Sequence, residues 1–246
     1  QEGHDFLNVA LTCKQCKTVL DMALKEEYGE TLARAMPMLL KELMSPLENS
    51  KKALVSLERI GWQPQSLEER MHVHMLHRDN QALVSLGLAA GEWLIKKIHW
   101  NTEFVAQVLG EIGASMTNSG DELKCRDSIV TALIQTMETC NRSYRKDPER
   151  SLALIQALGR IGDVRALPHF IAEMRNEYMD HHWNKASAET IVDVISCFGT
   201  EAVPGLVKEL HNPRAHVPGL AVKALLKIGQ PAVPELVKER EPIIQS

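Results

Sequence analysis

The chain has 246 residues, of which 44% are hydrophobic, 4% aromatic and 24% charged, and its formal net charge is −4. A net negative chain has no general attraction to phosphate, so nonspecific nucleic-acid binding is not expected. No apolar run approaches the roughly 20 residues that span a bilayer, so we expect no membrane insertion. Abundant aliphatic and few aromatic residues favour helices packed on helices.

The cysteines predict the compartment. An odd set of five in a chain of this length does not form a disulfide framework, which favours a reducing, cytoplasmic location. The first residues, QEGHDFLN, carry neither the basic leader nor the hydrophobic segment of a secretory signal.

Residues 1–44 are predicted to form an irregular N-terminal cap. Cys13 and Cys16 within it make a C-x-x-C motif, a weak metal candidate. Zinc normally needs two further ligands, of which His4 could supply one, and thiol exchange usually belongs to a βαβ context. We therefore interpret both cysteines as small buried hydrophobic residues on one helix face, with metal binding and redox chemistry as the alternatives.

One short phrase recurs along the chain, every few tens of residues. Such recurrence is typical of stacked modules, each of which contacts its neighbours, rather than of one closed globule. The copies are AMPMLLKEL from Ala35, GLAAGEWLIKKI from Gly87, GDVRALPHFIAEM from Gly162, GTEAVPGLVKEL from Gly199 and GQPAVPELVKER from Gly229.

Glycine and proline mark the helix boundaries of this phrase. Apolar residues three apart followed by Gly predict a buried last helical turn and a left-handed reversal, and Pro168, Pro204 and Pro234 fit the first turn of the next helix. Residues 45–140 hold divergent units, with a longer helix over about residues 122–140, and residues 141–246 hold regular ones. The glycines that are predicted to end helices are Gly29, Gly61, Gly87, Gly113, Gly162, Gly199 and Gly229.

The stretch DPERSLALIQALGRIGDVRALPHFI, from Asp147, resembles the HEAT-like repeats named after the phycobilisome (PBS) bilin-lyase family. The resemblance implies an all-α fold over residues 1–246: a right-handed α-α superhelix, or HEAT/armadillo-like solenoid, of about seven helix pairs. It also implies that the second helix of each pair lines a concave face. Because the repeat occurs in scaffolds, lyase-related chains and regulators, the resemblance implies no single activity.

Helical geometry selects the residues that would face a partner on that concave side. In the helix from Pro204, Leu206, Val207 and Leu210 form an apolar arc, and Gly205 and Lys208 lie opposite. Aligned units extend these two positions into columns that we take as the candidate partner-binding surface: Met38, Lys41, Trp93, Lys96, His169, Gly205, Lys208, Glu235 and Lys238.

Both main features of this surface have a structural alternative. The lysines could hold an acidic partner, or they could form a solvated mixed-charge face with the acidic residues of the next column. Trp93 could be an exposed contact residue, or it could pack on an adjacent repeat. The next column consists of Glu42, Glu173, Glu209 and Glu239.

We find no catalytic constellation. In MHVHMLH, His74 and His77 share a helical face but His72 does not, which is poor geometry for a metal site. A locally basic stretch could suggest the DNA-repair members of the HEAT-like class, although Asp147, Glu149 and Asp163 dilute it. The basic residues are Arg142, Arg145, Lys146, Arg150, Arg160 and Arg165.

The sequence therefore favours a non-enzymatic scaffold or protein-interaction module that grips a protein or peptide segment in its concave groove and needs no cofactor. A bilin-lyase-like or other ligand-handling accessory protein is the first alternative, and a HEAT-like DNA-binding or DNA-repair protein is the second. The charged end from Lys238, KEREP, would cap the last repeat with polar residues.

Overall fold

A computed structural model describes residues 29–44, 47–117, 120–142, 148–175 and 185–244. Within these ranges the chain is helical or in turns, without a β-strand, which confirms the all-α class. The chain divides into two compact units, Gln1–Asp79 and Asn80–Ser246. The boundary falls inside the segment that the sequence assigns to divergent repeats, and one continuous array over the whole chain stays a prediction.

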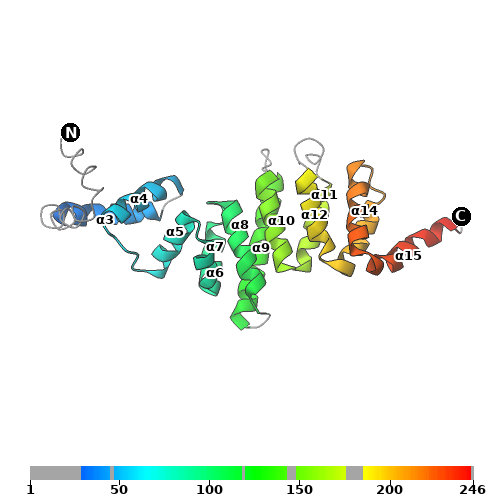
Figure 1. Cartoon of the computed structure of the whole chain (residues 1–246), viewed down its shortest axis with the longest axis horizontal. Coiled ribbons are helices and arrows are strands. Elements are labelled where there is room, and N and C mark those ends of the chain that lie inside the picture. Colours follow the sequence, from blue (N-terminus) through cyan, green and yellow to red (C-terminus); the bar gives the residue numbers. More distant parts are fainter. Residues whose placement is uncertain (1–28, 45–46, 118–119, 143–147, 176–184, 245–246) are drawn as a thin grey trace. The chain divides into compact units, whose positions relative to one another are not determined.

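The first unit contains three described helices (Figure 1). They are α3 (Gly29–Leu43), α4 (Leu47–Arg59) and α5 (Leu67–His77). Leu43, Leu54 and Leu57 are almost fully enclosed at their centre. Gly29, which the sequence analysis placed at the end of a helix, is instead the first residue of α3, and the residues before it lie outside the described part.

A capping box fixes the start of α5. Ser66 Oγ accepts the Glu69 amide at 3.1 Å, and Glu69 Oε2 accepts the Ser66 amide at 3.0 Å, so the two residues satisfy each other's donors. At the other end His77 Nε2 lies 3.0 Å from Glu58 Oε1 and joins α5 to α4.

The second unit is a succession of helix pairs. Its α-helices are α6 (Asn80–Ser85), α7 (Gly87–Lys97), α8 (Thr102–Ser115), α9 (Gly120–Arg142), α10 (Pro148–Ile161), α11 (Leu167–Met174), α12 (Lys185–Ser196), α13 (Val203–Glu209), α14 (His216–Ile228) and α15 (Val233–Ile244). Short 3-10 helices, η1 (Val164–Ala166), η3 (Gly199–Ala202) and η4 (Gln230–Ala232), precede α11, α13 and α15.

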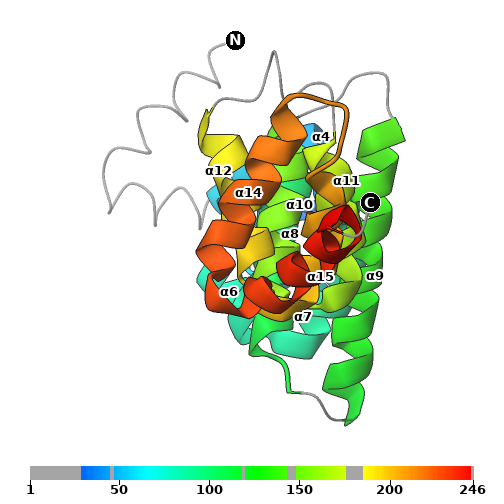
Figure 2. The same ribbon diagram turned by 90° about the vertical axis from the view of Figure 1, so that its right-hand side faces the viewer.

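The helices of this unit form two layers. In one, α8 packs along α10, α10 against α12 and α12 against α14; in the other, α7 packs on α9, α11 on α13 and α13 on α15. Figure 2, which looks from the end where α14 and α15 lie, shows α12 and α14 on one side and α9, α11 and α15 on the other.

The predicted glycine and proline signals explain the regular turns. Gly162, Gly199 and Gly229 have φ of 70°, 56° and 74°, a left-handed conformation that glycine adopts without a Cβ penalty. A 3-10 turn follows Gly162 and Gly229 and begins at Gly199, and each turn leads into a helix with proline in its first turn. Gly113 behaves differently: it lies inside α8, which continues to Ser115, so the prediction that it ends a helix is wrong.

Gly113 has a packing role instead. A Cβ built on it would lie 2.9 Å from Ile161 Cδ1, and one on Gly110 would lie 2.7 Å from Ala157 Cα, so glycine allows α8 to approach α10 closely. In α10 and α12 the residue three before the turn glycine is also small: Gly159 meets Val194, and Ser196 Oγ lies 3.4 Å from the Ala224 carbonyl. In the layer formed by α8, α10, α12 and α14, a small residue thus allows each helix to approach the next one closely.

Candidate functional site

The candidate site is a hollow of about 450 Å³ between α11 and α13. Apolar residues of α11 form one wall, and α13 supplies a glycine, a lysine and a glutamate. We call it the α11–α13 groove. Its lining residues are Val164, Leu167, Pro168, Ile171, Arg175, Glu201, Gly205, Lys208 and Glu209.

Gly205 shapes the floor of the α11–α13 groove. A Cβ at this position would lie 2.4 Å from Ile171 Cδ1, so the Ile171 side chain rests directly against the α13 backbone. The floor is therefore made by Ile171 and the glycine backbone, and a larger residue at 205 would push the isoleucine side chain into the groove.

An ion pair closes one end of the groove. Arg175 Nε donates to Glu209 Oε2 at 3.0 Å, the second guanidinium nitrogen donates to Oε1, and Asn212 Nδ2 donates to Oε2 at 2.7 Å. The Glu209 side chain is 3% exposed whereas that of Arg175 is 50% exposed, so the arginine reaches the solvent. Hydrogen bonds from Arg175, and then from Asn212, hold the pKa of Glu209 below its ordinary value against the opposing effect of burial.

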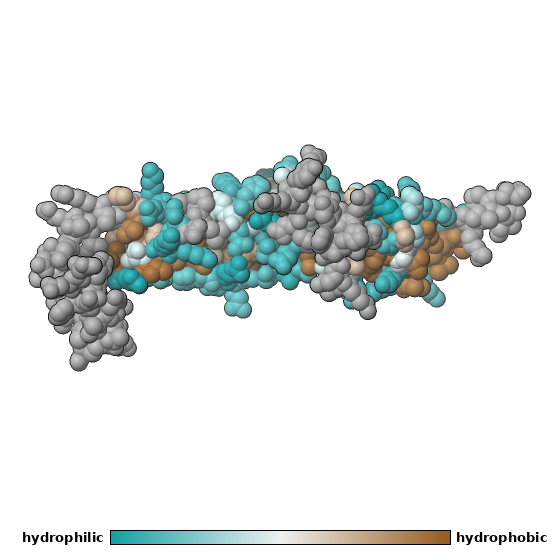
Figure 3. All heavy atoms as spheres, turned by 90° about the horizontal axis from the view of Figure 1, so that it is seen from above, coloured by the Kyte–Doolittle hydropathy of each residue, from teal (hydrophilic) through white to brown (hydrophobic). Residues whose placement is uncertain are grey.

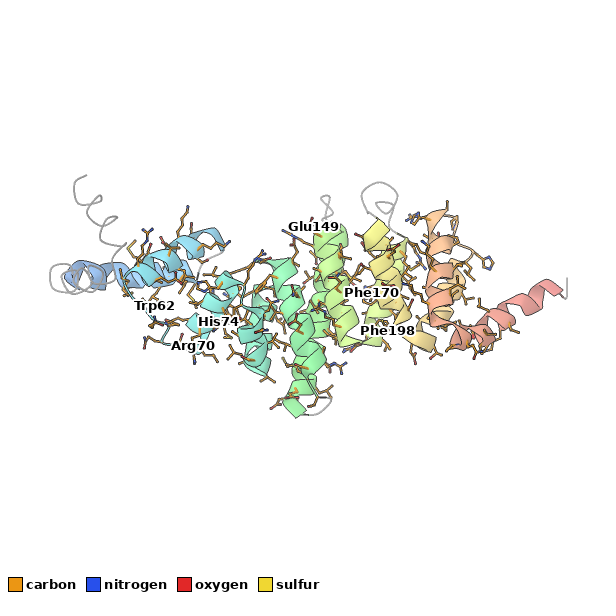
Figure 4. All side chains as sticks on the ribbon, in the orientation of Figure 1. Trp62, Arg70, His74, Glu149, Phe170 and Phe198 are labelled. Carbon is orange, nitrogen blue, oxygen red and sulfur yellow. The ribbon has the colours of Figure 1, made fainter. Side chains whose placement is uncertain are left out.

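An aromatic contact joins α11 to the segment that follows α12. Phe170 of α11 is fully buried, and its ring centroid lies 5.9 Å from that of Phe198, which follows α12 (Figure 4). His169 Nδ1 lies 3.7 Å from Glu138 Oε1 of α9. Helix α11 is thus in contact with α9 through His169 and with the segment after α12 through Phe170.

The structure brings only part of the predicted surface together. Gly205 and Lys208 line the α11–α13 groove, and His169 lies on α11 beside it, half-buried. Lys238 is exposed on α15, where its Nζ lies 3.0 Å from Glu235 Oε2.

The other predicted residues lie elsewhere. Met38 and Lys41 are exposed on α3 of the first unit, and Lys96 is exposed on α7. None of these three lines the α11–α13 groove.

Trp93 is not the exposed indole that the alignment suggested. It is 7% exposed on α7, a helix that packs against both α8 and α9. Lys97 Nζ lies 5.9 Å from its ring centroid and 4.0 Å from that of Trp100, and both distances are within the range of cation–π attraction. Of the two alternatives that the sequence left open, burial against neighbouring helices is the one observed.

Two residues of the acidic column differ from the solvated face that the sequence offered as an alternative. Glu173 and Glu209 are buried, whereas Glu42 is exposed. Arg175, Ile171 and Glu201 are not among the residues predicted from the sequence. Arg175 directly follows α11, and its partner Glu209 was predicted to be solvent-exposed. The sequence pattern therefore gave no reason to pair the two residues.

The metal candidates gain no support. Among the described residues no group of three or more His, Cys, Asp or Glu side chains could hold a metal ion. In α5, His72 is buried whereas His74 pairs with Asp79 at 3.3 Å. Cys13 and Cys16 lie outside the described residues.

Comparisons of the chain with protein-family models, with curated proteins and with solved structures find no match. No single described helix is long and apolar enough to cross a membrane. One bent pair, Ser187–Ser196 with Gly199–Glu209, passes on length and composition alone and is bent by 115°.

Proposed function

We propose that this chain is a right-handed, HEAT-like α-solenoid. We further propose that it acts as a non-enzymatic interaction module, which holds a segment of a partner protein in the α11–α13 groove. Support for the solenoid comes from the repeated unit of helix, left-handed glycine, 3-10 turn and proline-started helix, and from the two layers in which each pair contacts its neighbours. The observation that carries the binding proposal is the groove itself, with an apolar floor at Ile171 and Gly205 and an exposed lysine at its edge.

The charges of the groove indicate which segment fits. Arg175 already donates two hydrogen bonds to Glu209, so its charge is partly compensated. Lys208 is exposed and forms no ion pair within the described part of the chain. A segment with an apolar side chain on Ile171 and a carboxylate near Lys208 would satisfy both features.

The DNA-binding alternative is weakened by three ion pairs of two arginines. Arg160 Nη1 lies 2.9 Å from Glu111 Oε1, and Arg165 Nη2 lies 2.6 Å from both Asp127 and Asp163. Carboxylates thus already pair with two of the six basic residues, Arg160 and Arg165, that a phosphate backbone would use.

The test is capture by the immobilised chain followed by an affinity measurement. Wild type, Lys208→Glu and the control Lys223→Glu would each be used to capture partners, and the bound segment would be measured by calorimetry. Lys223 is also exposed, but on α14, outside the groove. We expect Lys208→Glu to weaken binding about tenfold and the control to leave it unchanged. Equal binding by both variants contradicts the proposal.

A further inference from the structure

The two helices that form the α11–α13 groove run in the same direction. Ile171 of α11 meets the Gly205 backbone of α13, and four residues further along each helix Arg175 meets Glu209. The groove therefore has two distinct ends. Its first end lies beside the 3-10 turns η1 and η3, and its second end lies where α11 and α13 finish.

Glu201 and Lys208 place opposite charges at these two ends. Both residues line the groove, both are exposed, and neither forms an ion pair within the described part of the chain. Gly205 follows Glu201 by four residues and precedes Lys208 by three, so helical geometry puts all three on one face. At the second end Arg175 and Glu209 compensate each other, so Lys208 supplies the positive charge that a ligand would meet there.

The spacing of these two charges favours an extended segment. Helical rise separates Glu201 from Lys208 by roughly 10–11 Å along the axis. In an extended chain, alternate residues point to the same face, and three of them in a row span about 13–14 Å, a difference that flexible charged side chains bridge. A helix is about 10–12 Å across with its side chains, which is too wide for a hollow of about 450 Å³ over this length.

The apolar floor of the groove lies between the two charges, because Ile171 rests on Gly205. Val164, which is 52% exposed, lies at the first end and offers apolar surface to the aliphatic stem of a lysine or arginine. By contrast, the exposed residues that gather as brown, hydrophobic atoms where α14 and α15 lie in Figure 3 are apolar and define no order of charges.

From these features we infer that the α11–α13 groove recognises an extended segment of a partner protein that carries a basic, an apolar and an acidic residue at alternate positions. Glu201 pairs with the basic side chain, Ile171 contacts the apolar one, and Lys208 pairs with the acidic one. Either chain direction satisfies this order of charges. This inference rests on the proposed function of the groove and adds the class of segment that the groove selects.

The test uses three fluorescein-labelled peptides, each with a central leucine and a charged residue two positions away on either side. The first peptide carries one lysine and one glutamate, the second two glutamates, and the third two lysines. Anisotropy should show wild type binding the mixed peptide about tenfold more tightly than either of the others. The preference should shrink in about 1 M salt, where the Debye length is about 3 Å.

Charge reversal at each end should change the preference in a defined direction. Glu201→Lys makes both ends positive and should favour the two-glutamate peptide, whereas Lys208→Glu makes both ends negative and should favour the two-lysine peptide. Glu92→Lys on α7 and Lys223→Glu on α14 are the matched controls, exposed and outside the groove. They should change no affinity by more than about twofold. An unchanged preference in either groove variant overturns the inference.

Gly205→Val separates this inference from the proposed function. Because the added side chain pushes Ile171 into the groove, it should weaken the binding of every peptide. Equal binding of the three peptides to wild type, with loss in Gly205→Val, overturns the order of charges and leaves the groove as the site. Absence of binding, or undiminished binding by Gly205→Val, contradicts both. Glu201 and Lys208 are exposed, so their variants should keep the wild-type melting midpoint, and a changed preference does not reflect unfolding.

Discussion

Gly110 of α8 and Ala157 of α10 are in backbone contact: a Cβ on Gly110 would lie 2.7 Å from the Ala157 Cα and 3.2 Å from its carbonyl oxygen. Neither atom belongs to a movable side chain. A methyl group at position 110 can therefore be accommodated only if the two helices separate, and α8 and α10 form the most extensive helix contact in the second unit.

Gly110→Ala should lower the free energy of unfolding by about 1–3 kcal/mol, because overpacking outweighs the helix propensity that alanine adds. The matched control is Gly219→Ala in α14, where no atom lies within 4 Å of the new Cβ. The control should raise stability by about 0.5–1 kcal/mol. Urea denaturation of both variants gives the comparison, and a stabilising Gly110→Ala would contradict the close approach.

Glu209→Gln should reduce stability at neutral pH by about 1.5–3 kcal/mol, because it removes charge-assisted hydrogen bonds to a buried carboxylate. The folded pKa of Glu209 lies below its ordinary value of 4.5. Its contribution is therefore complete above that value and is lost as pH falls through the lower folded pKa. Urea midpoints measured from neutral to acidic pH should show wild type and variant converging in acid.

Glu235→Gln provides the control for this pH series. Its ion pair with Lys238 is solvent-exposed at the lysine, so the variant should change stability by no more than about 0.5 kcal/mol. If the difference in urea midpoint between wild type and Glu209→Gln persists unchanged in acid, the ionised form of Glu209 is not the source of the stabilisation.

Two cysteines of the second unit should differ in reactivity. Burial, and then the nearby charge of Glu92, raise the pKa of the Cys125 thiol, whereas Cys197 is exposed after α12. Iodoacetamide labelling followed by peptide mass spectrometry should modify Cys197 at least about tenfold faster than Cys125. In urea the two rates should become similar, and rapid native labelling of Cys125 would show that its site opens.

Ser66→Ala should destabilise α5 by about 1 kcal/mol, because it removes the acceptor of the Glu69 amide. Ser56→Ala, in the interior of α4, is the control: its hydroxyl donates only to the Lys52 carbonyl within the same helix, so a change of no more than about 0.5 kcal/mol is expected. Hydrogen–deuterium exchange of the α5 amides measures both, and equal protection in the two variants would argue against the capping box.

Features set by local chemistry were predictable from the sequence. Left-handed glycines such as Gly162 and Gly199, and the prolines that follow them, depend on backbone sterics of a few consecutive residues, and the structure confirms them. Gly113 followed the same pattern but lies within α8, because its contact with Ile161 and not a turn accounts for the glycine.

Burial of the candidate site could not be predicted in the same way. The alignment placed Trp93 and Glu209 on an open face because periodicity reports one helix at a time. Trp93 is covered because α8 and α9 both pack on α7, and Glu209 is enclosed because Arg175 reaches it from α11. Lys208, whose position depends only on its own helix, is exposed as predicted.

The layered packing of the second unit affects the order in which its helices fold and unfold. Extensive helix contacts in Asn80–Ser246 join only elements that follow one another closely along the chain, so no distant ends must meet before a pair can assemble on its predecessor. Loss of order should begin in the least enclosed helices: backbone amides of α15, whose Val233 and Val237 are about half exposed, should exchange sooner than those of α8, whose Leu109 and Ile112 are fully enclosed.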